Sequence, residues 1–185
     1  MPIDTVALAR FLIGKMLVHD LRGERTSGRI VETEAYPIGD PAGHAFRGKT
    51  PRNAPLYLAR GHVYVYFIYG MYYCLNVSSE RAGVGAGVLV RALEPIEGID
   101  IMKERRGSSS LRDLARGPGR LTVAMAIDLR YNGVDLCSDP SLWLGTSESK
   151  YHGVVSATTR IGLSRERSRP WRFYERGSKF VSRSP

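Results

Sequence analysis

The stretch HVYVYFIYGMYYCLNVSS, residues 62–79, decides the fold that we expect for this chain. Its two arms are rich in aromatic and β-branched residues, which favour the pleated surface of a β-sheet. Gly70 lies between the arms and supplies the backbone freedom that a tight reversal needs. The pattern predicts a β-hairpin that is buried on both faces near its base and has Tyr69, Gly70 and Met71 at its tip.

The tip of this hairpin has two interpretations. Tyr69 and Met71 form a large apolar wedge on a glycine turn, and in a basic protein such a wedge is suited to insertion between stacked bases. Alternatively, the whole hairpin belongs to the core, with its tyrosine hydroxyls at the rim of that core. The hairpin sequence by itself leaves both interpretations open.

Length, composition and net charge limit the number of domains and the kind of partner that we expect. The 185 residues and the hydrophobic fraction of 43% suffice for one domain with a sizeable core. The formal net charge of +9 at pH 7 indicates a polyanionic partner, which is DNA, RNA or an acidic membrane surface. The two cysteines and four histidines show neither a disulfide framework nor a metal-ligand spacing, so we expect no bound metal.

The N-terminal segment, residues 1–17, carries charges within its apolar run MPIDTVALARFLIGKML. A signal peptide or a membrane-spanning helix needs a longer uninterrupted apolar segment. We therefore expect a protein without membrane attachment that resides in the cytoplasm, and in a bacterium at the nucleoid.

Hydrophobic periodicity along the chain predicts an α+β domain. Besides the hairpin arms, strands are expected at residues 15–21, 27–36, 87–93, 153–162 and 171–174, and helices near the N-terminus, at 95–106 and at 118–127. Residues 105–116 are rich in Ser and Arg and are expected to be mobile. We predict a single compact domain over residues 1–185 with a curved, mostly antiparallel sheet, flanking helices and a protruding hairpin.

Two carboxylates stand out in the run RIVETEAY, residues 29–36. Glu32 and Glu34 share one face of the expected strand with Tyr36, and successive residues on one face are about 7 Å apart. Ionised carboxylates are rarely buried unless they are paired or take part in function. The alternatives are a solvated strand face and a structural salt bridge to a nearby arginine.

Two polar residues occupy unexpected places in other strands. Arg91 lies in the apolar run VLVRAL, and burying its charge without a partner costs several kcal/mol. Its candidate partners are Glu32, Glu34 and Glu94. Asn76 lies in the second hairpin arm although Asn is depleted in strands, so we expect it to contact a ligand, a loop or the backbone.

Several long motifs, taken in order, resemble the alkyladenine (3-methyladenine) DNA glycosylase family. They are RIVETEAY at 29–36, TPRN at 50–53, YVYFIYGMYYCLN at 64–76, VLVRALEP at 88–95, TTRIGL at 158–163 and PWRFYERG at 170–177. The resemblance implies a hairpin that enters the minor groove of DNA. It further implies a monofunctional enzyme of base excision repair that hydrolyses the N-glycosidic bond of a flipped, alkylated purine, with no cofactor and no nucleophilic lysine.

The resemblance also implies roles for residues around the reacting bond. Glu34 falls at the position of the general base that activates a water molecule. Arg91 and the main-chain carbonyl of Ile161 would help to hold that water. Tyr69 falls at the position of the intercalating tyrosine, and Met71 lies beside it.

A second set of residues would form the base pocket. Tyr36, His44 and Tyr66 fall at positions that line this pocket in the family, and the two tyrosines would stack on the flipped base. Asn76 falls at the position that governs selectivity among bases. Stacking suits an alkylated purine because a cationic ring is attracted to the face of a tyrosine.

The expected partner is double-stranded DNA that carries an alkylated or deaminated purine, bound by a monomer. Positive side chains would contact the phosphates. The candidates for these contacts are Arg47, Lys49, Arg52, Arg116 and Arg120.

Three other functions compete with this prediction. A nucleic-acid-binding domain without catalysis would use the aromatic residues for stacking, but it would gain nothing from Glu34 near a polyanion. A hydrolase of free glycosides would use Glu32 and Glu34 as an acid–base pair, although parallel side chains on one strand do not flank a bond. An RNA-binding or formyl-transfer-associated domain would lack this set of tyrosines and glutamates.

Overall fold

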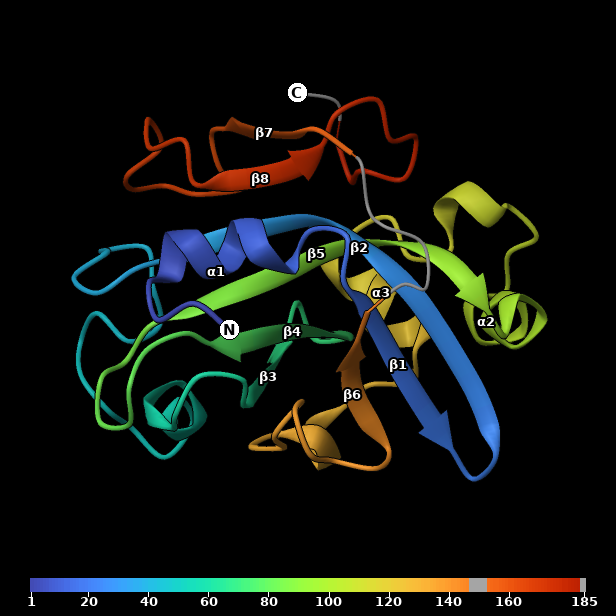
Figure 1. The fold of residues 1–185 in the computed structure, drawn as a ribbon, viewed down its shortest axis with the longest axis horizontal. Coiled ribbons are helices and arrows are strands. Elements are labelled where there is room, and N and C mark those ends of the chain that lie inside the picture. The colour runs from blue at the N-terminus through green and yellow to red at the C-terminus, as the bar shows by residue number, and fades with distance from the viewer. Residues whose placement is uncertain (147–152, 184–185) are drawn as a thin grey trace.

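A computed structural model describes residues 1–146 and 153–183 of the chain. Within these ranges, eight strands form one antiparallel sheet that curls into a half-barrel, and three α-helices pack against it (Figure 1). The predicted α+β class and the mostly antiparallel, curved sheet are confirmed. None of the described helices is long and apolar enough to cross a bilayer.

Strand β2 is the centre of the sheet. The strand order is β3 (Val63–Ile68), β4 (Tyr72–Ser78), β5 (Gly87–Glu97), β2 (Glu24–Tyr36), β1 (Met16–Leu21) and β6 (Leu142–Gly145). A second hairpin, β7 (Val155–Thr158) and β8 (Arg172–Glu175), joins the sheet because β8 pairs with β2. One edge of β2 therefore pairs with β5, and the other pairs with β1 and then β8.

Three α-helices complete the core. Helix α1 (Thr5–Leu12) begins at Asp4, whose side chain accepts a hydrogen bond from the Ala7 N–H, and it lies across β2 and β5 in Figure 1. It buries Leu8 and Leu12 fully. Helices α2 (Ile99–Arg106) and α3 (Pro118–Ala124) pack on each other, and α3 also packs on β4 and β5. Short 3-10 helices are η1 (Ala54–Tyr57), η2 (Leu111–Asp113) and η3 (Leu129–Tyr131).

The helix that we expected to start at Pro95 starts at Ile99, so that prediction was wrong. Strand β5 continues through Pro95 because pairing with β2 outweighs the tendency of proline to open a helix. Gly98 ends the strand with φ 68°, and a Cβ there would collide with the carbonyl of Arg25. Ile96, which lies within the range predicted for the helix, is half exposed near the end of β5.

Residues 105–116 include the end of α2 and the short helix η2. Leu114 and Ala115 are fully buried, and the Arg106 side chain donates a hydrogen bond to the Leu114 carbonyl at 3.1 Å. The mobility of this segment stays a prediction.

The hairpin β3–β4 is buried at its base and exposed at its tip. Val63, Tyr64 and Val65 are at most 1% exposed, whereas Tyr69 is 84% exposed and Met71 is 64% exposed. Tyr69 and Gly70 both have positive φ, which closes the turn between Ile68 and Tyr72. The hairpin therefore belongs to the core only at its base, and the apolar tip projects from the molecule.

Candidate active site

A cavity of about 440 Å³ lies between strand β2, the hairpin, residues 37–46 and the segment around Ile161. Seven of the residues predicted for the site line it, together with Tyr64 and Cys74. The seven are Tyr36, His44, Tyr66, Tyr69, Asn76, Arg91 and Ile161. Its wall is thus mainly apolar and aromatic, with a few polar groups, which is typical of a ligand site. Met71 lies at the exposed hairpin tip and does not line the cavity.

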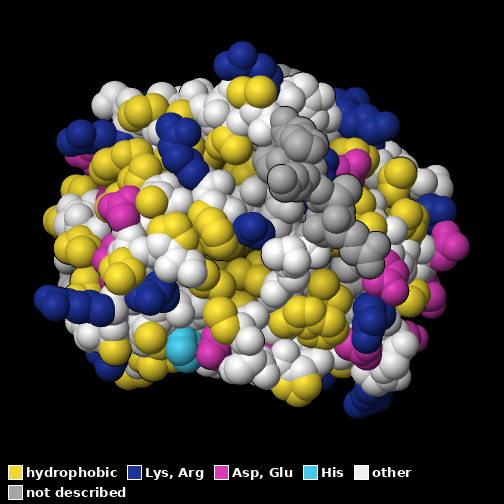
Figure 2. Space-filling view, in the orientation of Figure 1, with side chains coloured by type: hydrophobic (Ala, Val, Ile, Leu, Met, Phe, Trp, Pro, Cys, Tyr) yellow, Lys and Arg dark blue, Asp and Glu magenta, His cyan; other side chains and the backbone are white. Residues whose placement is uncertain are grey.

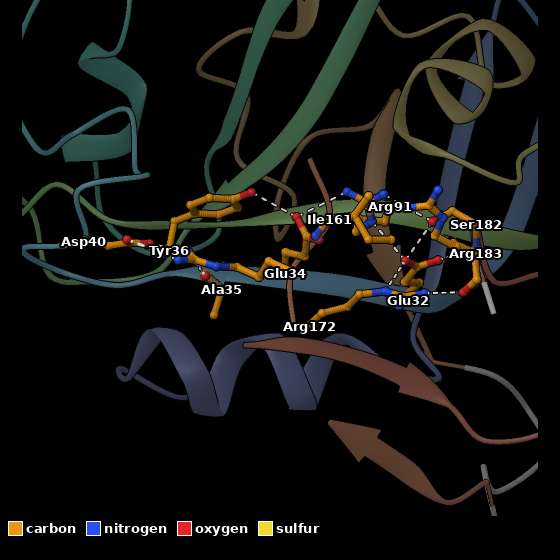
Figure 3. Close-up of polar contacts among 11 residues, drawn as sticks. Glu32, Glu34, Ala35, Tyr36, Asp40, Arg91, Ile161, Arg172, Ser182 and Arg183 are labelled. Carbon is orange, nitrogen blue, oxygen red and sulfur yellow. Dashed lines mark hydrogen bonds and ion pairs between the residues drawn. The ribbon is translucent and has the colours of Figure 1, made fainter. Parts of the chain in front are cut away.

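Glu34 is fully buried beside this cavity and is held from three directions (Figure 3). One carboxylate oxygen accepts a hydrogen bond from the Ile161 N–H at 2.8 Å. The other accepts one from the Tyr36 hydroxyl at 2.9 Å and lies 3.2 Å from Nη1 of Arg91. Because Tyr36, Arg91 and Ile161 all line the cavity, they fix the carboxylate at its edge.

Arg91 reaches both carboxylates because β5 has an irregularity at this point. Its neighbours Ala92 and Val90 pair with Glu32 and Thr33, so Arg91 is the extra residue of a bulge. Its Nε donates a hydrogen bond to Glu32 at 2.9 Å while Nη1 pairs with Glu34. Burial would lower the pKa of Arg91, but the two carboxylates raise it, so the guanidinium stays charged.

Glu32, the other carboxylate on this face of β2, is held by a network of ion pairs and hydrogen bonds. It is fully buried and accepts hydrogen bonds from Arg91, from Arg172 on β8 at 2.7 Å, and from the Ser182 hydroxyl at 2.8 Å and the Ser182 N–H. Burial would raise the pKa of Glu32, but the charges of Arg91 and Arg172 and the Ser182 hydrogen bonds hold it below its ordinary value. The third candidate partner of Arg91, Glu94, pairs instead with Arg29.

The far wall of the cavity is aromatic and uncharged. Nδ1 of His44 lies 2.9 Å from the Tyr64 hydroxyl, and its ring lies 4.4 Å from that of Tyr66, measured between centroids. Burial, followed by the charge of Arg52, lowers the pKa of His44, so the imidazole is neutral at neutral pH.

Two tyrosines present hydroxyl groups to the site. Burial, with smaller contributions from Glu34 at Tyr36 and Cys74 at Tyr66, raises the pKa of both, so both remain protonated donors. The Asn76 side chain donates a hydrogen bond to a backbone carbonyl, that of Tyr64, at 3.2 Å and also lines the cavity.

The positive residues predicted to contact phosphates fall into two groups. Arg47 and Arg52 line an open groove of about 780 Å³ that adjoins the cavity, and Lys49 lies in the same loop. Arg52 also donates a hydrogen bond to the Phe67 carbonyl at 3.3 Å. The second group is engaged in contacts within the protein: Arg116 donates a hydrogen bond to the Val181 carbonyl at 2.7 Å, and Arg120, whose side chain is about half exposed, donates one to Asp113 at 3.1 Å.

Figure 2 shows one face of the molecule, on which Lys and Arg side chains are spread out and do not form one patch. Among the residues described, no group of three or more His, Cys, Asp or Glu side chains is placed to hold a metal.

Several residues of the site escaped the sequence analysis. Tyr64, Arg160, Arg172 and Ser182 all contact predicted residues or line the cavity. The two arginines carried a signal, because each is directly followed by an apolar residue within a motif that resembles the family, Arg160 by Ile161 and Arg172 by Phe173. For Ile161 the family resemblance implied that the carbonyl holds the water, whereas the observed contact with Glu34 is made by the N–H. The role of the carbonyl stays a prediction.

Comparison with known proteins identifies relatives over nearly the whole chain. A model of the family described as methylpurine-DNA glycosylase matches residues 1–179. The chain is 58% identical over 182 residues to a protein of Mesorhizobium japonicum, covering 98% of this chain and 87% of that protein. It is 46% identical over 180 residues to a protein of Carboxydothermus hydrogenoformans, covering 97% and 94%. Both are named "Putative 3-methyladenine DNA glycosylase".

Glu32→Gln removes the charge that pairs with Arg91 and Arg172. We expect it to lower the free energy of unfolding by about 3 kcal/mol or more at neutral pH. Folding lowers the pKa of Glu32. Its carboxylate therefore stabilises the folded state at pH values above the ordinary pKa of a glutamate, and this contribution is lost as the pH falls through the lowered pKa. The difference between wild type and variant therefore shrinks toward about pH 3.

Urea unfolding of the wild type and of Glu32→Gln, at neutral pH and at about pH 3, measures this difference in the free energy of unfolding. The control is Glu94→Gln, whose partly exposed pair with Arg29 should contribute about 1 kcal/mol or less. An equal difference at both pH values for Glu32→Gln would contradict the pairing.

Proposed function

Because the chain belongs to the methylpurine-DNA glycosylase family, we propose that it is a monofunctional DNA glycosylase that hydrolyses the N-glycosidic bond of alkylated purines in duplex DNA. One observation carries the proposal: the buried carboxylate of Glu34 lies at the edge of an aromatic cavity that opens beside an exposed apolar hairpin tip. A domain that only stacks on nucleic acid has no use for that carboxylate.

The first step is extrusion of the damaged nucleotide. A base within a duplex is out of reach of a protein cavity, so it must be turned out at a cost of a few kcal/mol. Tyr69 is suited to this step because its ring is exposed at the hairpin tip and also borders the cavity. Its ring would fill the gap in the stack while the base enters the cavity.

The cavity then holds the base between rings. Tyr36, His44 and Tyr66 supply aromatic surface, and stacking on such surface contributes about 1–3 kcal/mol per base. Neutral His44 adds no charge of its own to this wall. Asn76 remains the candidate for discrimination among bases through its side-chain amide.

The chemical step is hydrolysis at C1′ of the sugar. A water molecule attacks C1′ while the C1′–N bond breaks, and the electron pair of that bond leaves with the purine. Glu34 accepts a proton from the water and stabilises the positive charge that develops on the sugar. Arg91 and the Ile161 N–H hold the carboxylate in place. The products are the free base and an abasic site, and the proton passes to solvent or to the base.

Glu34→Gln tests the general base directly. The amide keeps the shape of the side chain and removes the charge, so base release should fall by at least about 10²-fold. Binding to lesion DNA should persist or tighten, because a carboxylate near phosphates is repelled. The measurement is release of one defined lesion from a duplex under single-turnover conditions, with and without alkali treatment of the strand.

Glu32→Gln is the matched control for this experiment, because it lies on the same strand and pairs with the same arginine. It should reduce base release much less than Glu34→Gln does. If Glu32→Gln were inactive and Glu34→Gln active, the assignment of the general base to Glu34 would be wrong. Normal release by both variants would place water activation elsewhere.

Tyr69→Ala should weaken engagement with the lesion far more than it disturbs folding. The ring is 84% exposed, and exposed substitutions usually change stability by about 0.5 kcal/mol or less. Thermal unfolding and lesion-duplex affinity measure the two effects. Ile96→Ala, at an exposed apolar residue of β5, is the control and should change neither. Parallel losses of stability and activity in Tyr69→Ala would support a core role for the tip.

Binding to duplex DNA should depend strongly on salt, because phosphate contacts release counterions. We expect affinity to fall by about 10²-fold or more between about 50 and 200 mM salt. Arg47→Gln, in the groove beside the cavity, should make this dependence shallower, whereas Arg22→Gln in the β1–β2 turn should leave it unchanged. Affinity that does not vary with salt would exclude this mode of binding.

A further inference from the structure

Arg160 is a buried arginine with no part in the chemistry proposed above. Its side chain is completely buried and forms an ion pair with Asp40, which is also completely buried. One of its terminal nitrogens donates a hydrogen bond to the Ala35 carbonyl at 3.0 Å, and the other lies 3.2 Å from Asp40. These contacts fix the guanidinium beside the end of β2, next to Tyr36, in the region drawn in Figure 3.

The guanidinium of Arg160 lies between two aromatic rings. Its central carbon is 4.7 Å from the ring centroid of Tyr36 and 5.0 Å from that of Trp171. Its Nε finds no hydrogen-bond partner in the part of the chain that the structure describes, which suits a group stacked between rings. Tyr36 lines the cavity whereas Arg160 is absent from its lining, which is consistent with contact on the ring face turned away from the cavity.

This arrangement bears on which bases the cavity favours. The face of an aromatic ring attracts positive charge through its quadrupole. A fixed cation behind Tyr36 already uses this attraction, and it repels a second positive charge stacked on the opposite face. The carboxylate of Asp40 offsets part of that repulsion. A neutral base on the cavity side of Tyr36 experiences none of it.

We propose that Arg160, with its counterion Asp40, is a specificity-determining residue that shifts the Tyr36 face toward neutral purines and away from cationic ones. The proposal rests on the function proposed above, in which the extruded base stacks on Tyr36. Arg160 touches no reacting atom and acts through the ring that it supports. The two members of the pair have opposite effects, so their variants should change selectivity in opposite directions.

The test uses three variants. Arg160→Gln combined with Asp40→Asn removes both charges and leaves neither partner as an unpaired buried ion. Asp40→Asn alone keeps the cation and removes its counterion. The matched control is Arg169→Gln, because Arg169 is an exposed arginine that stacks on the same Trp171 at 5.3 Å, not on Tyr36.

The readout is the rate of release of 7-methylguanine, which is cationic, divided by that of hypoxanthine, which is neutral, from otherwise identical duplexes. The double variant should raise this ratio by about threefold to tenfold, Asp40→Asn should lower it, and Arg169→Gln should leave it unchanged. Affinity for the same two duplexes, measured with Glu34→Gln added to each protein, should give the same order without catalysis.

A purely structural role for Arg160 would slow release of both bases equally and leave the ratio unchanged, and this result would overturn the proposal. If thermal unfolding shows that the double variant does not fold, Asp40→Asn alone tests the proposal, because an unchanged ratio in that variant would also overturn it. Failure of the proposed function looks different: the wild-type protein would release neither base and would bind neither lesion more tightly than undamaged DNA.

Discussion

The structure depends on one buried guanidinium between two buried carboxylates. Arg91 on β5 contacts Glu32 at 2.9 Å and Glu34 at 3.2 Å, and neither carboxylate has exposed side-chain surface. The guanidinium side chain is itself only 9% exposed, so each charge depends on the others to offset the cost of its burial. The bulge at Arg91 makes this possible, because it turns one residue of β5 toward both glutamates of β2. Strand pairing and the direction of Glu34 are therefore fixed together.

The charged face of β2 is closed by segments from the end of the chain. Strand β8 supplies Arg172, the segment before it supplies the Ile161 N–H, and the C-terminal residues supply Ser182 (Figure 3). The opposite face of β2 packs toward α1, where the Thr33 hydroxyl donates to the Ala9 carbonyl at 2.9 Å. A strand that is buried on both faces thus presents charge on one of them, and the site is complete only when the end of the chain has docked.

Sequence reasoning recovered what local patterns encode. The bulky arms of the hairpin predicted its buried base, and Arg91 within an apolar run predicted a partner such as the carboxylates that it contacts. The exposure of the tip was left open by the sequence and was decided by the structure. The family resemblance is confirmed as well. Contacts between distant segments were out of reach, since Arg172 and Ser182 lie 140 and 150 residues from Glu32. The helix expected after Pro95 failed for a related reason: pairing with β2 is a tertiary interaction, and it overrides a local preference.

The buried ion network is better explained by geometry than by stability. Replacing a buried ion pair with well-packed apolar residues is often neutral or stabilising, so a fold alone does not require Glu32, Arg91 and Arg172. Apolar side chains, however, could not aim a guanidinium at Glu34 or hold its carboxylate at the cavity edge. Glu32 pairs with Nε of Arg91 while Nη1 pairs with Glu34, so the guanidinium is held in one orientation toward Glu34. The buried ion network therefore fixes the orientation of the Glu34 carboxylate, which is the group that the proposed reaction uses.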